Sequence, residues 1–116
     1  GIEISAEAIR SAQRTVAELG LEGVKFAAGD ATEFAVNARE IPEVLVVNPP
    51  RRGIGERLCA WVEGSGIEHV IYSSCNAKTL AADLARMPSY KPVAARVLDM
   101  FPHTNHYEVM TLLRRG

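Results

Sequence analysis

The chain has 116 residues, of which 47% are apolar, 23% charged and 6% aromatic, which is enough material for one small globular domain and not for two. It has 13 Lys and Arg residues and 14 Asp and Glu residues, and with a net charge of −1 no polybasic arm or acidic tail indicates a partner, which leaves nucleic-acid binding neither shown nor excluded. No apolar run approaches the roughly 20 residues of a membrane-spanning helix and no secretion signal opens the chain, so we expect a cytoplasmic protein without a membrane partner.

Apolar runs and helical periodicity alternate along the chain. Strands are expected at residues 1–4, 24–28, 44–47, 70–72, 91–98 and 107–113. Helices are expected between an N-cap at Ser5 and a C-cap at Gly20, and at 32–37, 55–62 and 78–87, the last one stopped by Pro88. The run 44–47 is apolar without alternation, as in a strand covered on both faces. This order predicts an α/β fold with a largely parallel sheet and helices on both faces.

Unusual polar residues gather where these strands end. Ligands of such folds bind at the carboxyl ends of the strands. The clusters at these ends are Glu3, Asp30, Asn48-Pro49-Pro50-Arg51 and Ser74-Cys75-Asn76.

Cys75 follows a buried strand and comes just before a helix. The amides of the first helical turn would stabilise a thiolate there, which makes Cys75 a candidate nucleophile. The alternative is a small buried apolar residue, the commoner fate of a free cysteine, but the polar neighbours Ser73, Ser74 and Asn76 favour the nucleophile. Cys59 lies in the middle of a predicted helix, where packing alone accounts for it.

Three other strand ends carry candidate binding residues. The segment Asn48-Pro49-Pro50-Arg51 presents an amide from stiff, extended backbone, which suits recognition of a planar base or is only a stiff turn. Glu3 could accept both hydroxyls of a ribose, or be a solvated carboxylate. Asp30 could accept from an adenine amine, or serve as an Asx-turn residue.

Glu108 lies in a mostly apolar strand near the end of the chain. A carboxylate there could take part in proton transfer, although a solvated glutamate on an edge strand is the usual case. His103 and His106 precede it in a loop, but no third ligand is evident, so no metal site is predicted.

Several segments, in this order, resemble the RNA 5-methyluridine methyltransferases, which use S-adenosylmethionine. The resemblance runs over the whole chain and rests on Asn48-Pro49-Pro50-Arg51-Arg52-Gly53-Ile54-Gly55, Tyr72-Ser73-Ser74-Cys75-Asn76-Ala77, Asp99-Met100-Phe101-Pro102-His103-Thr104 and His106-Tyr107-Glu108. It favours the branch that acts on 23S ribosomal RNA over the transfer-RNA branches, because many relatives have Asp in place of Asn48. It implies a Rossmann-like methyltransferase fold, with a mostly parallel sheet and a C-terminal antiparallel strand pair.

The resemblance also implies a role for each candidate residue. Cys75 would attack carbon 6 of a uracil, and Glu108 would remove the proton from carbon 5 after methylation. Asn48, together with Pro49 and Arg51, would contact the reacting base or the edge of the cofactor. Glu3 would hold the ribose of S-adenosylmethionine and Asp30 its adenine.

The resemblance further implies that residues 1–116 are the C-terminal part of a catalytic domain. The family's domain begins with a strand and a Gly-rich acidic loop, whereas this chain starts at the following strand. An RNA-binding domain and, in some relatives, an iron–sulfur cluster would lie in the missing upstream region. We therefore expect this chain alone to be inactive.

Two other functions fit some of these residues. An Asn-Pro-Pro turn is common in S-adenosylmethionine-dependent methyltransferases that act on an amide or an adenine amine, which need no thiol nucleophile. The chain could instead be a non-catalytic binding fragment. A requirement for Cys75 distinguishes the uracil enzyme from both.

Overall fold

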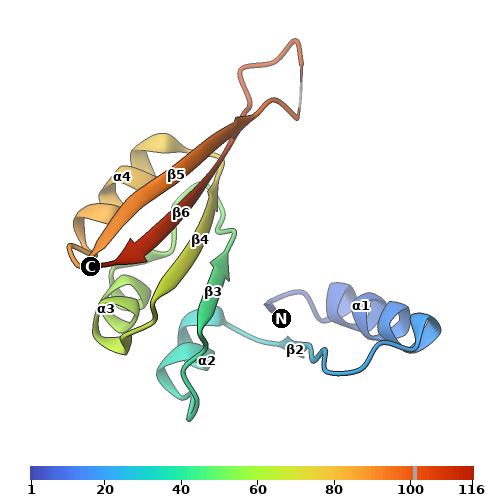
Figure 1. Ribbon diagram of the computed structural model, residues 1–116. Helices are drawn as coiled ribbons and strands as arrows, with labels where there is room; N and C mark the ends of the chain where they lie inside the picture. Colours follow the sequence, from blue (N-terminus) through green and yellow to red (C-terminus); the bar gives the residue numbers. More distant parts are fainter. Residues whose placement is uncertain (101) are drawn as a thin grey trace. The chain divides into compact units, whose positions relative to one another are not determined.

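The computed structural model describes residues 1–100 and 102–116 (Figure 1). Strands and helices follow one another in the predicted order. They form two compact units, Gly1–Arg39 and Glu40–Gly116. No helix among the described residues is both long enough and apolar enough to span a membrane.

The first unit contains strand β1 (Ile2–Glu3), helix α1 (Ala6–Leu19), strand β2 (Ala27–Ala28) and helix α2 (Ala31–Val36). The predicted caps of α1 are confirmed: the Ser5 side chain accepts from the backbone N–H of Ala8, and Gly20 is left-handed with φ 64°. The strand expected at 24–28 shrinks to its last two residues. Its partner β1 offers only two residues before the chain turns into the Ser5 cap, so the parallel ladder cannot extend further.

The second unit is a four-stranded sheet with two helices. Its strands are β3 (Val44–Val47), β4 (His69–Ser74), β5 (Tyr90–Leu98) and β6 (Glu108–Arg115), and its helices are α3 (Gly55–Ser65) and α4 (Ala77–Ala85). The strand order is β3-β4-β6-β5. Strands β3 and β4 are parallel, whereas β6 runs antiparallel to both β4 and β5.

The core of this unit lies between one face of the sheet and its two helices. The fully buried side chains of the core come from α3, β4, β6 and the segments beside them: Cys59, Val62, Ile67, Val70, Tyr72, Met87 and Leu113. The expectation that 44–47 is covered on both faces is wrong for this unit. Val44 and Val46 are 48% and 65% exposed, while Leu45 and Val47 are half-buried, because α3 and α4 pack together on a single face.

The place of β6 decides where the functional residues meet. The predicted C-terminal antiparallel pair is present, but β6 also inserts between β4 and β5, so the sheet is mixed rather than mostly parallel. Since β6 runs against β4, its first residue lies at the edge of the sheet where β3 and β4 end. Figure 1 shows these three strands side by side.

Candidate functional site

Three chain segments meet at the carboxyl ends of β3 and β4. Val47 pairs with Tyr72 and Ser74 pairs with Val109. Asn48 therefore follows the last residue of β3, Cys75 follows the last residue of β4, and Glu108 is the first residue of β6. The sheet itself therefore brings three of the predicted site residues of this unit to one edge.

Glu108 is held by two donors, one on β4 and one at the residue that follows β3. The Ser73 hydroxyl donates to Glu108 Oε1 at 2.9 Å. In the amide orientation that satisfies its neighbours, Asn48 Nδ2 donates to Glu108 Oε1 at 3.2 Å and to the Ser73 carbonyl oxygen at 3.2 Å. The interpretation of Glu108 as a solvated edge residue is wrong, because β6 is an interior strand and this side chain is half-buried. Two donors aimed at one oxygen fix the orientation of the carboxylate.

Cys75 is a free, half-buried thiol in the turn between β4 and α4. Ser74 Oγ accepts from the Asn76 backbone N–H at 3.0 Å and donates to the Asn76 carbonyl oxygen at 2.9 Å. Asn76 caps α4, because its Oδ1 accepts from the Lys78 N–H at 3.1 Å. The residues on both sides of Cys75 are thus fixed, which confirms its predicted place just before a helix.

The other cysteine, Cys59, has a different environment from Cys75. It is fully buried in α3, and its thiol lies 3.7 Å from the Asp83 carbonyl oxygen. Burial, together with the nearby Asp83 carboxylate, raises the pKa of Cys59 to about 12, so its thiol stays protonated at neutral pH. The packing role predicted for Cys59 is confirmed.

The loop that follows Asn48 is a tight turn fastened to α4. The Gly53 N–H donates to the Pro50 carbonyl oxygen at 2.9 Å. The Arg51 carbonyl oxygen accepts from Asn76 Nδ2 at 3.2 Å and from Thr79 Oγ1 at 2.7 Å. These bonds make the segment rigid, which both of its interpretations require, and the Arg51 side chain is exposed.

The remaining two candidates, Glu3 and Asp30, lie in the first unit at the ends of β1 and β2. Glu3 Oε1 accepts from the Ser5 N–H at 3.2 Å. Asp30 Oδ1 accepts from the Glu33 N–H at 2.9 Å and so caps α2, which confirms the local turn role of Asp30 and leaves Oδ2 for a ligand.

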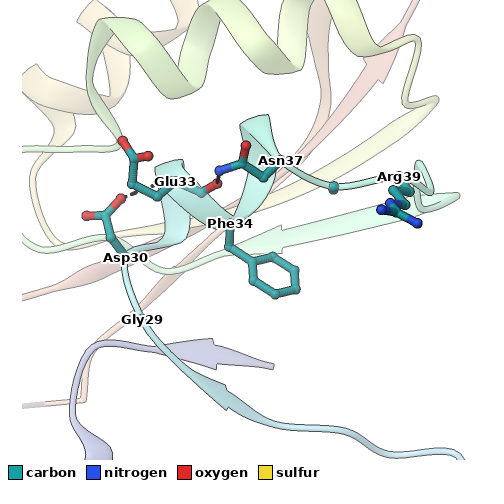
Figure 2. Close-up of a pocket in the computed structure, with 7 residues that line it drawn as sticks. Gly29, Asp30, Glu33, Phe34, Asn37 and Arg39 are labelled. Carbon is teal, nitrogen blue, oxygen red and sulfur yellow. Dashed lines mark hydrogen bonds between the residues drawn. The ribbon is translucent and has the colours of Figure 1, made fainter.

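An open pocket of about 530 Å³ adjoins Asp30 (Figure 2). The pocket belongs wholly to the first unit and is lined by Gly29, Asp30, Glu33, Phe34, Asn37, Ala38 and Arg39. The Phe34 ring is 53% exposed beside it. An aromatic ring next to a carboxylate suits a planar base with an amino group.

The comparison with known proteins decides the family. The family model described as tRNA (Uracil-5-)-methyltransferase matches residues 2–116. The chain belongs to this family. The resemblance inferred from the motifs is thereby confirmed.

Several curated relatives of this family member are ribosomal-RNA enzymes by name. It is 51% identical over 115 residues to the 23S rRNA (uracil(747)-C(5))-methyltransferase RlmC of Pectobacterium carotovorum subsp. carotovorum (strain PC1), which covers 99% of this chain and 31% of that protein. It is also 51% identical over 113 residues to RlmC of Escherichia coli (strain 55989 / EAEC), which covers 97% of this chain and 30% of that protein. The chain thus spans less than a third of the length of these relatives.

Solved structures confirm the methyltransferase fold. The Pyrococcus abyssi tRNA (uracil-54, C5)-methyltransferase, in complex with S-adenosyl-L-homocysteine, matches with a TM-score of 0.87 and 30% identity over 97% of this chain and 27% of that chain. TrmN from Thermus thermophilus matches with a TM-score of 0.65 and 18% identity over 99% of this chain and 35% of that one, which shows the fold alone.

Sequence reasoning missed three residues in this methyltransferase-family chain. Ser73 holds Glu108, Phe34 flanks the pocket, and Asp83 is a fully buried carboxylate in α4. A signal existed only for Ser73, which begins the polar pair Ser73-Ser74 at the end of β4. The sequence pattern does not distinguish an exposed Phe from a buried one, or a buried Asp from a solvated one.

Proposed function

We propose that the whole protein transfers a methyl group from S-adenosylmethionine to carbon 5 of a uridine in RNA, and that residues 1–116 form the C-terminal part of its catalytic domain. The membership of the family and the names of the relatives support the reaction. The short coverage of those relatives supports the assignment as a part of the domain. The single observation that supports this chemistry is that Cys75 and an oriented Glu108 lie at the same edge of the sheet.

The first chemical step belongs to Cys75. Its thiolate forms a bond to carbon 6 of the uracil, and the electron pair of the 5,6 double bond moves onto carbon 5 and the carbonyl oxygen at position 4. Carbon 5 thereby becomes a nucleophile. S-adenosylmethionine, when bound, supplies the methyl group that carbon 5 takes.

The second step belongs to Glu108. Its carboxylate accepts the proton that remains on carbon 5, the 5,6 double bond forms again, and the bond between carbon 6 and the Cys75 sulfur breaks. The thiolate is the leaving group and is ready for another turnover. Donation from Ser73 and Asn48 to one carboxylate oxygen leaves the other oxygen to take the proton.

The residues of the first unit fit the cofactor. Asp30 Oδ2 would accept from the adenine amine, beside the exposed ring of Phe34. Glu3, at the end of β1, would accept from the ribose hydroxyls. S-adenosylmethionine is therefore the proposed methyl donor.

The substrate class follows from the rigid loop after β3. Asn48 presents its amide at the sheet edge, and the stiff Pro49 backbone and the exposed Arg51 would face the base and the RNA backbone. Such a site requires the uridine to leave its stack. The relatives favour 23S ribosomal RNA, with transfer RNA as the less favoured alternative, and such a substrate would place the protein in the cytoplasm.

The decisive experiment is covalent trapping in the whole protein. RNA containing 5-fluorouridine has no proton to lose at carbon 5, so the adduct through Cys75 should persist and appear as a denaturation-resistant band. Cys59→Ala should still form this band, whereas Cys75→Ala should form none. Full methylation of RNA by Cys75→Ala would show that the protein uses another chemistry, such as methylation of an amine. Absence of both trapping and methylation in the unmodified protein would favour a binding fragment.

A further inference from the structure

Asp83, on α4, has no exposed surface, and its carboxylate collects three donors. Oδ2 accepts from the Tyr72 hydroxyl at 2.5 Å and from the Ile54 backbone N–H at 2.8 Å. Oδ1 accepts from Arg86 Nη1 at 3.2 Å. A buried carboxylate is costly unless it is hydrogen-bonded in this way, so these donors determine how Asp83 sits in the core.

The Ile54 N–H connects this carboxylate to the proposed active site. Ile54 ends the loop that begins at Asn48, and the middle of the same loop is held through the Arg51 carbonyl oxygen by Asn76 and Thr79. Residues 76, 79 and 83 follow one another at helical spacing at the start and along one face of α4. The helix that follows Cys75 therefore fastens the loop at two points.

Gly53 shows how closely the loop approaches Asp83. A Cβ atom at this position would lie 2.4 Å from Asp83 Oδ2, and Gly53 has a φ of +82°. Only glycine allows both the close approach and this backbone conformation. The backbone of the loop thus packs directly against the buried carboxylate.

Tyr72 bonds the same Asp83 oxygen, Oδ2, that accepts from the Ile54 N–H, and its hydroxyl lies beside Gly53 of the loop. Burial raises the pKa of Tyr72, and the bond to Asp83 and the negative charge of that carboxylate raise it further. The hydroxyl therefore stays protonated and donates to Asp83 over the working pH range. Tyr72 lies on β4, so this bond ties α4 to the sheet.

We propose that Asp83 is a positioning residue for uridine methylation. Through the Ile54 N–H it holds the loop 48–54 against α4, and this keeps Asn48 beside Glu108 and at a fixed distance from Cys75. Asp83 contacts no reacting atom. The inference rests on the proposed function, because the distance it fixes matters only if these residues act together on a base.

Three variants of the whole protein separate this role from simple packing. Tyr72→Phe is the reference, because it removes one donor to Asp83 and leaves the Ile54 bond. Adding Asp83→Leu removes the acceptor of the Ile54 N–H and replaces the carboxylate by an apolar side chain of similar size, while the partner hydroxyl is already absent. Adding Asp83→Asn to Tyr72→Phe restores an acceptor oxygen for Ile54.

Two measurements are made on each variant. Hydrogen exchange at the Ile54 amide reports the anchor itself, with the core amides of Val70 and Leu113 as the control for folding. Steady-state methylation of a 23S ribosomal-RNA fragment reports kcat and the KM for S-adenosylmethionine. Relative to Tyr72→Phe, the Leu variant should exchange Ile54 faster and lose about tenfold to a hundredfold in kcat, the range expected when reacting groups shift by an ångström. Its cofactor KM should stay within about twofold, because Glu3 and Asp30, which would hold the ribose and the adenine, belong to the first unit and not to this loop.

The outcomes are distinguishable. Recovery of both slow exchange and kcat in the Asn variant would establish the positioning role. Fast exchange at Ile54 with unchanged kcat would overturn it, and so would unchanged exchange in the Leu variant. If the Leu variant loses protection at Val70 and Leu113, Gly53→Ala displaces the loop from an intact Asp83 and must lower kcat. An unmodified protein that methylates no uridine would instead refute the proposed function and any catalytic role of Asp83, while exchange still decides whether Asp83 anchors the loop.

Discussion

Ser73 on β4 donates its hydroxyl to Glu108 on β6 at 2.9 Å, although 35 residues separate them in the chain. The antiparallel pairing of the two strands creates this bond, since Ser73 pairs with Met110 and Glu108 begins the strand. The bond orients a carboxylate next to the thiol-bearing turn. The proposed division of labour between Cys75 and Glu108 depends on this arrangement.

Glu108→Gln should allow methyl transfer but slow the release of product. The adduct forms through Cys75, and only the later removal of the carbon 5 proton needs the carboxylate. A covalent RNA complex should therefore accumulate with unmodified RNA, measured by denaturing electrophoresis. The matched control is Glu63→Gln, another half-buried glutamate bonded by a serine hydroxyl, from Ser89 at 2.5 Å. Normal turnover in Glu108→Gln would mean that a different group is the base.

The buried thiol of Cys59 should make the fold sensitive to alkali. The folded pKa of about 12 lies above the ordinary value of 9.0, so the folded state holds this proton more tightly than the unfolded state does. The stability that Cys59 contributes is complete below about pH 9 and declines as the pH rises from about 9 to 12. The melting temperature of the wild type should fall more steeply with pH over that window than the melting temperature of Cys59→Ala. Parallel curves for the two proteins would contradict the prediction.

Gly53→Ala should destabilise the second unit more than Gly66→Ala does. Both glycines have a left-handed φ, +82° and +79°, so both substitutions carry the same backbone cost of about 1–3 kcal/mol. A Cβ at Gly53 also meets Asp83 Oδ2 at 2.4 Å, whereas a Cβ at Gly66 meets nothing within 4 Å. The midpoint of urea unfolding should therefore be lower for Gly53→Ala than for Gly66→Ala. Equal midpoints would show that the loop moves away from Asp83 without a cost in stability.

Asp30→Ala should weaken the binding of S-adenosylmethionine. The loss of one hydrogen bond to a charged acceptor is worth about 1.5–3 kcal/mol, which is roughly a tenfold to hundredfold change in Kd. Since Asp30 also caps α2, the control is Ser5→Ala, which removes the cap of α1 in the same unit. Titration calorimetry on the whole protein should show weaker binding for Asp30→Ala alone. Equal weakening in both variants would assign the effect to helix stability.

Local sequence determined the parts of the site that depend on neighbours in the chain. The helix caps Ser5 and Gly20, the strand at 44–47 and the place of Cys75 between a strand and a helix were all predicted, because each depends on residues within a few positions. The chemical family followed from short motifs for the same reason.

Only the tertiary structure decided which of these parts meet. The sequence predicted β5 and β6 as a final pair, but the insertion of β6 beside β4 is a long-range pairing, and it alone moves Glu108 from a presumed edge to the thiol. The burial of Asp83 could not be predicted from the sequence either, since a charged residue in a helix is ordinarily solvated. Its donors Tyr72 and Ile54 lie 11 and 29 residues away, and a buried charge is tolerated only where such distant donors converge.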